Sequence, residues 1–525
     1  MVLFYLNSIN LCNQLPINKL MKTIVVLFDE KNKYENEKVF DGKSAVELCN
    51  KAAQSLDLQV VVLDQKAENL DTIASLFAVL DKICRQNAAN TLIFSYADCP
   101  FLNNALTKEL LDTHLQYKAE YTFAEGYPAG FAPVVLDTGT IAILAELART
   151  TAASTGERKI TRNSVSDLIK TDINSFEVET VLAPLDWRLL RFSFDCASKN
   201  NFLCCQKLYE LCSDKDKLFD QNAAELSKKA AVSPQLLKTV PSFYNLQLAQ
   251  KCRGKCSYCP YPCAEQTGIM DTQKAFDLIE KIAAYSGEAV VGLSAWGECF
   301  NHPDLLKIME KILSYEGLSV FIEADGNSIP QSFAADLKAL TDKAAERTNG
   351  WQKVMVVVSM DGFTEQTCKS LRGADFDLNK AVTAVSELEK AVPGCVFPQF
   401  VRMNDNEAEL EGFFRYWNEK TNASNGSFII QKHNNFAGLL PNQEPADLSP
   451  LERNVCWHLR RDMTVLYNGD VPMCWSCVME NITGNVFTSG LEEVWKQTDE
   501  EIKNQAGGAY CKKCGGCDEF YTFNF

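Results

Sequence analysis

Several features are scarce or missing in this sequence, and each absence excludes a class of protein. No apolar run approaches the ~20 residues that a membrane span needs, so we expect no membrane-spanning helix. The formal net charge is −16, and no run of Lys and Arg indicates a general nucleic-acid-binding surface. Histidine occurs only four times, and no Ser/His/Asp arrangement suggests hydrolytic catalysis.

The beginning of the chain lacks a secretory signal. Residues 1–20 include an apolar stretch, but they have neither a basic n-region nor a small-residue cleavage site. Met21 opens a strand-like segment, so we expect it to be the initiator and residues 1–20 to be an over-called start. The alternative is a short ordered extension. In either case we expect a cytoplasmic protein.

Cysteine, by contrast, is abundant, with 21 residues in a chain of 525. Dense disulfide frameworks belong to small secreted domains that lack a sufficient core. In this long chain the cysteines cluster by spacing, which favours metal ligation in a reducing compartment.

The first part of the chain alternates short apolar runs with helix-like segments. The apolar runs cover residues 22–28, 58–63 and 91–96, and segments 44–55 and 70–85 between them have helical spacing. This alternation predicts βαβ units in a parallel, doubly wound sheet. Residues 200–240 are expected to form a helical connector.

The alternation restarts after this connector and predicts a partial, open (βα)6 barrel. Chemistry in such barrels takes place at the carboxyl ends of the strands. The expected strands are 243–248, 289–294, 318–323, 354–359, 396–401 and 428–431, and the expected helices are 272–285, 303–315, 332–347, 378–390 and 407–420.

The first barrel strand is followed directly by a C-x3-C-x2-C motif, Cys252, Cys256 and Cys259. Three thiolates this close can bind three irons of a [4Fe–4S] cluster and leave the fourth iron open for cofactor or substrate chemistry. A zinc site would favour paired C-x2-C units, so it is the weaker alternative. Cys263 is expected to be a spare thiol.

The last segment is rich in cysteine and poor in apolar periodicity, so a metal would supply stability that its core lacks. Its six cysteines predict metal binding, and a zinc ribbon stays open as the chief alternative to an iron–sulfur cluster. The six are Cys456, Cys474, Cys477, Cys511, Cys514 and Cys517.

The cysteine motif resembles that of the radical S-adenosylmethionine (SAM) superfamily. The resemblance implies an oxygen-sensitive cluster whose open iron chelates SAM, which is reductively cleaved to a 5′-deoxyadenosyl radical. It also implies anaerobic handling, an electron donor such as a flavodoxin or ferredoxin, and packing of Tyr258 near the adenine.

Later strand ends carry further motifs similar to those of this superfamily. In AWGECFNHPDL, Gly297 would approach the methionyl group of SAM and Glu298 its amino group, although Trp296 replaces the usual first glycine. Ser359 would contact the ribose or carboxylate. The other similar segments are Glu323–Gly326, Ser359–Gly362 and Leu371–Gly373.

The C-terminal order of cysteines, GN pair and LEEVW resembles the SPASM extension of radical SAM enzymes. This implies an auxiliary [4Fe–4S] cluster, and with six cysteines we expect one. The preferred ligands are Cys456, Cys474, Cys514 and Cys517, with Cys477 and Cys511 in reserve.

The N-terminal domain is similar to nucleotidyltransferases, in which an aspartate at the position of Asp98 holds Mg²⁺ beside the nucleotide. The loop after its first strand has no glycine and is acidic, which suits phosphates poorly, so a binding or scaffold role is favoured. The combination resembles the spiro-SPASM family. The expected domains are 1–20 (extension), 21–199 (nucleotidyltransferase-like), 200–240 (connector), 241–445 (radical SAM core) and 446–525 (SPASM-like).

The leading hypothesis is therefore a radical SAM enzyme that abstracts hydrogen from an unknown substrate, with a peptide or protein as the first candidate. One alternative is a nucleotidyl- or glycosyl-type transferase with structural or regulatory clusters. It would show nucleotide-dependent transfer that is lost in Asp98→Ala. Another is a non-catalytic cluster-bearing binding protein, which would form no 5′-deoxyadenosine.

Overall fold

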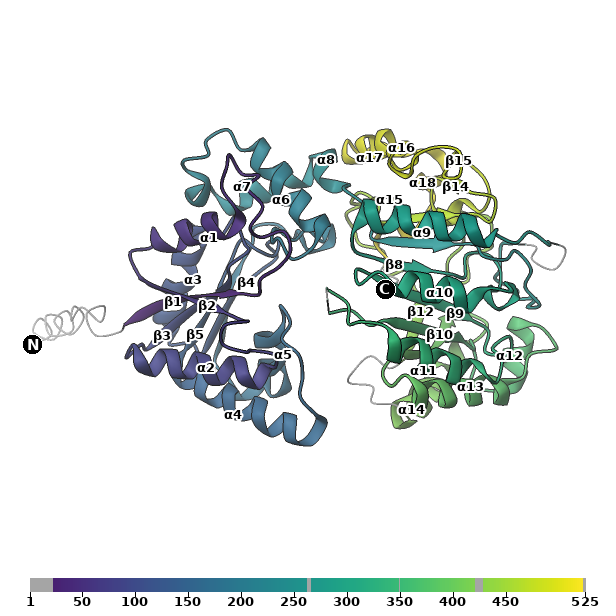
Figure 1. Cartoon of the computed structure of the whole chain (residues 1–525), viewed down its shortest axis with the longest axis horizontal. Coiled ribbons are helices and arrows are strands. Elements are labelled where there is room, and N and C mark those ends of the chain that lie inside the picture. Colours follow the sequence, from purple (N-terminus) through teal and green to yellow (C-terminus); the bar gives the residue numbers. More distant parts are fainter. Residues whose placement is uncertain (1–21, 262–265, 349, 421–427, 523–525) are drawn as a thin grey trace, which may run out of the picture. The chain divides into compact units, whose positions relative to one another are not determined.

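The computed structural model describes residues 22–261, 266–348, 350–420 and 428–522 (Figure 1). The chain divides into two compact units, Met1–Ala230 and Ala231–Phe525. The expectations for residues 1–20 and for Cys263 lie outside the described residues. Within the described part, no helix is both long enough and apolar enough to cross a membrane.

The N-terminal unit is built on a six-stranded sheet with the order β2-β1-β3-β5-β4-β6. The three apolar runs that the sequence singled out form β1, β2 and β3, which lie next to one another, with β2 at the edge. The strands are β1 (Thr23–Asp29), β2 (Gln59–Asp64), β3 (Thr91–Tyr96), β4 (Tyr121–Glu125), β5 (Val134–Asp137) and β6 (Val178–Leu182).

This sheet is mixed, whereas the sequence predicted a parallel one. Strand β5 runs antiparallel to both β3 and β4. The loop from β4 to β5 spans only residues 126–133. A parallel neighbour needs a crossover of a dozen or more residues, so this loop can only reverse the chain.

Helices lie on both faces of the N-terminal sheet (Figure 1). On one face, Ile24, Val26 and Phe28 of β1 share a core with Leu76 and Phe77 of α2, as expected for alternating residues of a strand. The helices are α1 (Ala45–Gln54), α2 (Ile73–Gln86), α3 (Asn104–Tyr117), α4 (Thr138–Thr155), α5 (Ser164–Thr171), α6 (Lys199–Leu211) and α7 (Ala223–Ala231).

The stability of this unit should depend on pH through His114 of α3. Its ring is buried and lies 3.0 Å from the Thr122 hydroxyl, and burial lowers its pKa to about 4. The unfolded chain takes up a proton near pH 6.5, so stability is lost as the pH falls from there towards 4. We expect a loss of about 2 kcal/mol by pH 5. The measurement is hydrogen exchange of β4 amides, and His114→Gln should remove the dependence.

The second unit contains a seven-stranded, fully parallel sheet with the order β12-β11-β10-β9-β8-β7-β13. The first six strands in the chain confirm the predicted partial (βα)6 barrel. Strand β13, which pairs with β7, was not predicted. The strands are β7 (Phe243–Leu246), β8 (Ala289–Gly292), β9 (Leu318–Ala324), β10 (Val354–Ser359), β11 (Val396–Arg402), β12 (Ile429–Lys432) and β13 (Asp462–Val465).

Helices between the strands cover one face of this sheet (Figure 1). All five predicted helices are present, and α12 is an additional one. The opposite face holds a smaller apolar cluster that includes Phe243, Val290, Phe321 and Val357. The helices are α9 (Thr272–Ser286), α10 (Leu305–Leu313), α11 (Phe333–Lys343), α12 (Glu365–Arg372), α13 (Leu378–Ala391) and α14 (Leu410–Lys420).

The C-terminal segment packs on the barrel and shares its main core. Val486, Leu491 and Trp495 belong to the same apolar cluster as Leu278 and Ile282 of α9. This segment therefore does not rely on a core of its own. Its elements are α15 (Trp457–Arg461), β14 (Asp470–Pro472), β15 (Ile482–Asn485), α16 (Leu491–Lys496), α17 (Asp499–Ala506) and α18 (Lys512–Gly515).

Candidate functional site

The cysteine loop after β7 is fastened to the end of α12. The Lys255 N–H donates to the Arg372 carbonyl at 3.1 Å, and the Ser257 N–H donates to the Leu371 carbonyl at 2.8 Å. Gly373 has a φ of +109°, and a Cβ there would lie 3.2 Å from the Lys255 Cβ. The Leu371–Gly373 motif therefore has a structural role: its backbone binds the loop that carries the three cysteines.

All seven barrel residues predicted as ligands or SAM contacts line one cavity of about 210 Å³. They come from the cysteine loop and from the ends of β8 and β10, as expected for carboxyl ends of parallel strands. Within the described residues, no further cysteine lines this cavity. The seven are Cys252, Cys256, Tyr258, Cys259, Gly297, Glu298 and Ser359.

One wall of the cavity contains a buried ionic cluster that the sequence did not single out. Arg372 forms an ion pair with Asp361, whose side chain is fully buried. The Arg372 guanidinium also donates to the Tyr258 hydroxyl at 2.6 Å, and that hydroxyl donates to Asp361. The second Asp361 oxygen accepts from the Val401 N–H at 2.8 Å. These bonds fix Tyr258 beside the cysteines.

A second polar group lies at the ends of β9, β10 and β11. The Ser359 hydroxyl donates to Glu323 at 3.0 Å, and the Gln399 amide donates to the same Glu323 oxygen at 2.7 Å. Burial raises the pKa of Glu323. These side chains offer the cavity donors and acceptors on rigid strand ends.

Glu298 and Gly297 follow β8. The Glu298 carboxyl is buried, and burial, with Asp325 and Cys252 nearby, raises its pKa to about 8. A Cβ at Gly297 would lie 1.8 Å from the Ala249 carbonyl oxygen. Position 297 therefore requires glycine so that the backbone can pack against the segment that leads into the cysteine loop. This requirement holds independently of any contact between Gly297 and a ligand.

Trp296, at the position of the missing glycine, stacks on Trp475 from the C-terminal segment. The ring centroids are 4.7 Å apart, with an interplanar angle of 12°. Trp296 adopts a φ of +34°, which is uncommon for a bulky residue. Trp475 also lines a second cavity. The stacked pair thus joins the barrel site to the C-terminal cysteines.

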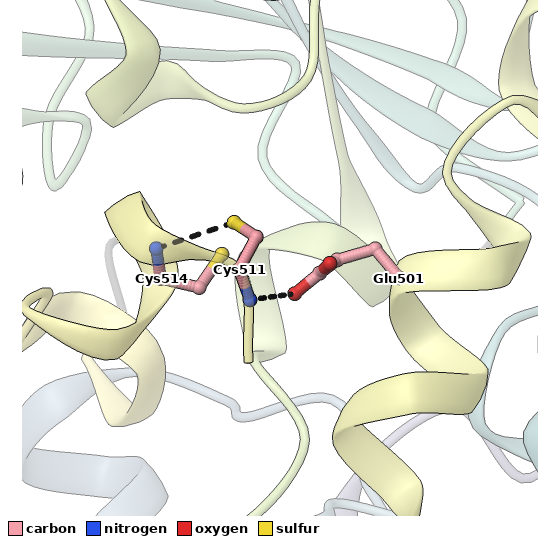
Figure 2. Close-up of side chains that lie close together, drawn as sticks. All are labelled: Glu501, Cys511 and Cys514. Atoms are coloured by element: carbon pink, nitrogen blue, oxygen red, sulfur yellow. Dashed lines mark hydrogen bonds between the residues drawn. The ribbon is translucent and has the colours of Figure 1, made fainter. Parts of the chain in front are cut away.

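That second cavity is lined by five of the six C-terminal cysteines. All four preferred ligands are among them, together with Cys477, whose sulfur lies 3.6 Å from that of Cys474. Cys511 instead lies with Glu501 and Cys514 (Figure 2). The five are Cys456, Cys474, Cys477, Cys514 and Cys517.

The donor sets fit the groups that the sequence implies. Thiolates are the ligands of iron–sulfur clusters. Cys252 and Cys256 are partly exposed residues and Cys259 is exposed, and all three lie on a loop that lines the cavity. Three such ligands with polar strand ends nearby suit a cluster with one open iron and a small polar cofactor.

In the N-terminal unit, Asp98 is buried beside Arg162. The guanidinium donates to both carboxylate oxygens, at 2.8 and 2.7 Å, and the Asn32 amide donates at 2.9 Å. Arg162 also pairs with Glu30 at 2.7 Å. Bidentate pairing of this kind is strong and engages the oxygens that a Mg²⁺ ion would need.

Comparison with known proteins identifies a relative for about two thirds of the chain and a family model for its C-terminal part. Residues 456–518 match the SPASM iron–sulfur cluster-binding domain. An uncharacterized protein of Treponema pallidum is 36% identical over 367 residues, which cover 69% of this chain and 98% of that protein.

Two solved structures are similar to parts of the chain. Streptococcus suis SuiB bound to precursor peptide SuiA is 12% identical and covers 59% of this chain and 78% of its own, with a TM-score of 0.42. A cytidylyltransferase from Leptospira borgpetersenii is 12% identical and covers 41% and 97%, with a TM-score of 0.33. Given its extended similarity to the Treponema protein, the chain belongs to one family with that protein, and it carries a SPASM-type iron–sulfur cluster-binding domain at residues 456–518.

Proposed function

We propose that this protein is an enzyme that reductively cleaves SAM at a [4Fe–4S] cluster and abstracts hydrogen from a substrate that is still to be identified. The observation that carries the proposal is the position of three thiols on one loop at the end of β7, facing a cavity lined by polar strand ends. A peptide or protein is the first substrate class to test, since SPASM relatives often modify such molecules.

The residues of the barrel divide into ligands and groups that orient the cofactor. Cys252, Cys256 and Cys259 would hold the cluster. Glu298 and Ser359 would bind the polar groups of SAM. When bound, the cluster and SAM supply the electron and the 5′-deoxyadenosyl radical. The protein's own task is to fix these groups and to exclude water.

Tyr258 and Arg372 support this task from the wall of the cavity. Both side chains donate to buried Asp361, and Arg372 also donates to the Tyr258 hydroxyl, so these bonds hold the loop between the second and third cysteines. The expected contact between the Tyr258 ring and adenine is compatible with these bonds, because they use only its hydroxyl group.

The C-terminal domain would add one auxiliary [4Fe–4S] cluster. Four of the five thiols that line its cavity suffice as ligands. Trp475 lines both this cavity and the barrel cavity, so it would lie beside the auxiliary cluster as well as beside the barrel site. We expect a flavodoxin or ferredoxin as electron donor in the cytoplasm.

For the N-terminal unit we propose a binding or scaffold role. The bidentate bond from Arg162 to Asp98 supports this role over nucleotide transfer, because it engages both carboxylate oxygens.

The test is anaerobic reconstitution followed by a SAM cleavage assay under dithionite. We expect the wild-type chain to form 5′-deoxyadenosine. If a fully iron-loaded chain forms no 5′-deoxyadenosine, the proposal is rejected. Deletion of residues 446–525 is not a clean control, because it removes β13 from the barrel sheet. The single replacement Cys474→Ser tests the auxiliary site without that damage.

A further inference from the structure

The N-terminal unit contains a cavity of about 600 Å³ between its sheet and α5. Ligand sites for small molecules have volumes of about 300–1,000 Å³, and this cavity is larger than the barrel cavity of about 210 Å³. Its lining comes from strands β3, β4, β5 and β6 and from α5, all of which belong to one unit (Figure 1). None of the predicted cluster ligands lines it.

The walls of this cavity are mostly apolar. Phe94, Phe123 and Val178 line it from the sheet, and Val165 and Ile169 line it from α5. All five belong to the apolar core of the unit or pack against it, and Phe123 and Val178 are only partly buried. Apolar surface is therefore open to a ligand, and its burial would drive binding of an apolar body.

Three charged groups on the lining already have strong partners. The Arg162 guanidinium pairs with Asp98 at 2.7 Å, and Glu125 forms an ion pair with Arg188. The carboxylate of Asp195 accepts hydrogen bonds from two neighbouring side chains. Because its only guanidinium is engaged by a carboxylate, this end of the cavity suits a phosphate poorly.

Two other groups on the lining, Lys170 and Tyr121, have no polar partner among the residues that the structure describes. Lys170 lies in the last turn of α5 and is exposed. Tyr121 is the first residue of β4, and only 5% of its surface is exposed. A hydroxyl on so buried a side chain is more stable when it donates to an acceptor.

The chain path brings these two groups towards the same end of the cavity. The short helix Ile173–Ser175 leads from the end of α5 into β6. Val178, the first residue of β6, pairs with Tyr121. An ammonium group and a phenol hydroxyl are both donors, and together they match the two oxygens of a carboxylate.

We propose that this cavity binds an apolar monocarboxylate. The carboxylate would accept from the Lys170 ammonium and the Tyr121 hydroxyl, while the apolar body lies between the sheet and α5. This inference names a ligand class for the binding role proposed for the N-terminal unit, and it does not depend on SAM cleavage. The carboxylate supplies the charge that Lys170 lacks among its described neighbours.

The experiment is a calorimetric titration of the full chain with decanoate, below the concentration at which decanoate forms micelles. We expect saturable binding of one molecule per chain. Lys170→Met should weaken binding at least about 10-fold, because a charge-assisted hydrogen bond is lost. Tyr121→Phe should weaken it about 2- to 10-fold, because one hydrogen bond is lost and the ring stays in place.

Matched controls test the two parts of the proposed ligand. Lys108→Met removes an exposed ammonium group of α3 that does not line the cavity, so it should leave the affinity unchanged. Decanol has the same apolar body without the carboxylate and should bind at least about 10-fold more weakly than decanoate. Equal affinities for the two compounds, equal effects of the two lysine variants, or no binding by the wild type would overturn the proposal. Decanoate binding without SAM cleavage would reject the proposed function and leave this site standing.

Discussion

A chain with Cys252, Cys256 and Cys259 replaced by alanine is expected to form no 5′-deoxyadenosine and to lose the iron of the barrel site. The reason is that, among the described residues, these three are the cysteines that line the barrel cavity. Iron in the C-terminal domain should remain, because its ligands line a separate cavity. Iron analysis and the SAM cleavage assay measure the two effects.

The variant should stay folded, which keeps this prediction interpretable. Cys252 and Cys256 are only partly buried and Cys259 is exposed, so their replacement creates no core cavity. Cys263→Ala is the matched control, since it removes a thiol four positions beyond Cys259. It should keep cleavage and iron. Cleavage by the triple variant would show that the barrel thiols are not the ligands.

The sequence was sufficient to predict the barrel and the residues that line its cavity. Its predicted strands are runs of four to six residues with helices between them, and this alternation favours a parallel sheet. Polar motifs placed directly after the strands then converge at one edge. This is why Glu298 and Ser359 could be placed near the cysteines without a structure.

Contacts between distant segments could not be predicted in this way. Strand β13 has only four residues, Asp462–Val465, and it pairs with β7 more than 200 positions earlier. The ion pair of Asp361 and Arg372 depends on how α12 returns to the strand ends. The motifs that contain these residues, Ser359–Gly362 and Leu371–Gly373, were visible in the sequence. Nothing in either motif indicated that the Asp361 and Arg372 side chains would pair with each other and with Tyr258.

The sequence showed that Trp296 replaces the usual glycine. It did not show which contact would stabilise a tryptophan at that position. A bulky residue with positive φ is normally strained. The stacking of buried Trp296 on partly buried Trp475 offsets this cost through the interaction of the aromatic faces, which contributes about 0.5–1.5 kcal/mol beyond burial. The partner comes from the segment between Cys474 and Cys477, so the departure in the barrel is matched by a residue of the SPASM domain.

The C-terminal domain is also fastened to the barrel by Lys432, the last residue of β12. Its ammonium group forms ion pairs with Asp518 at 2.9 Å, with Glu519 at 2.6 Å and with Glu444. All four side chains are at least four-fifths buried. Asp518 directly follows Cys517, so this cluster sets the position of a predicted cluster ligand.

Lys432→Met is therefore expected to open the terminal cysteine loop and to release C-terminal iron, while the barrel iron stays. Removing one partner of a buried ion pair leaves uncompensated charge and costs about 3–5 kcal/mol, which corresponds to roughly 150- to 5,000-fold faster hydrogen exchange. The measurements are iron content and exchange of the amides of Glu519–Tyr521. Lys496→Met removes an exposed pair with Glu492 and should cost less than about 0.5 kcal/mol. Equal effects of the two variants would show that Lys432 does not hold this loop, because the exposed pair contributes only the weak attraction of two hydrated charges.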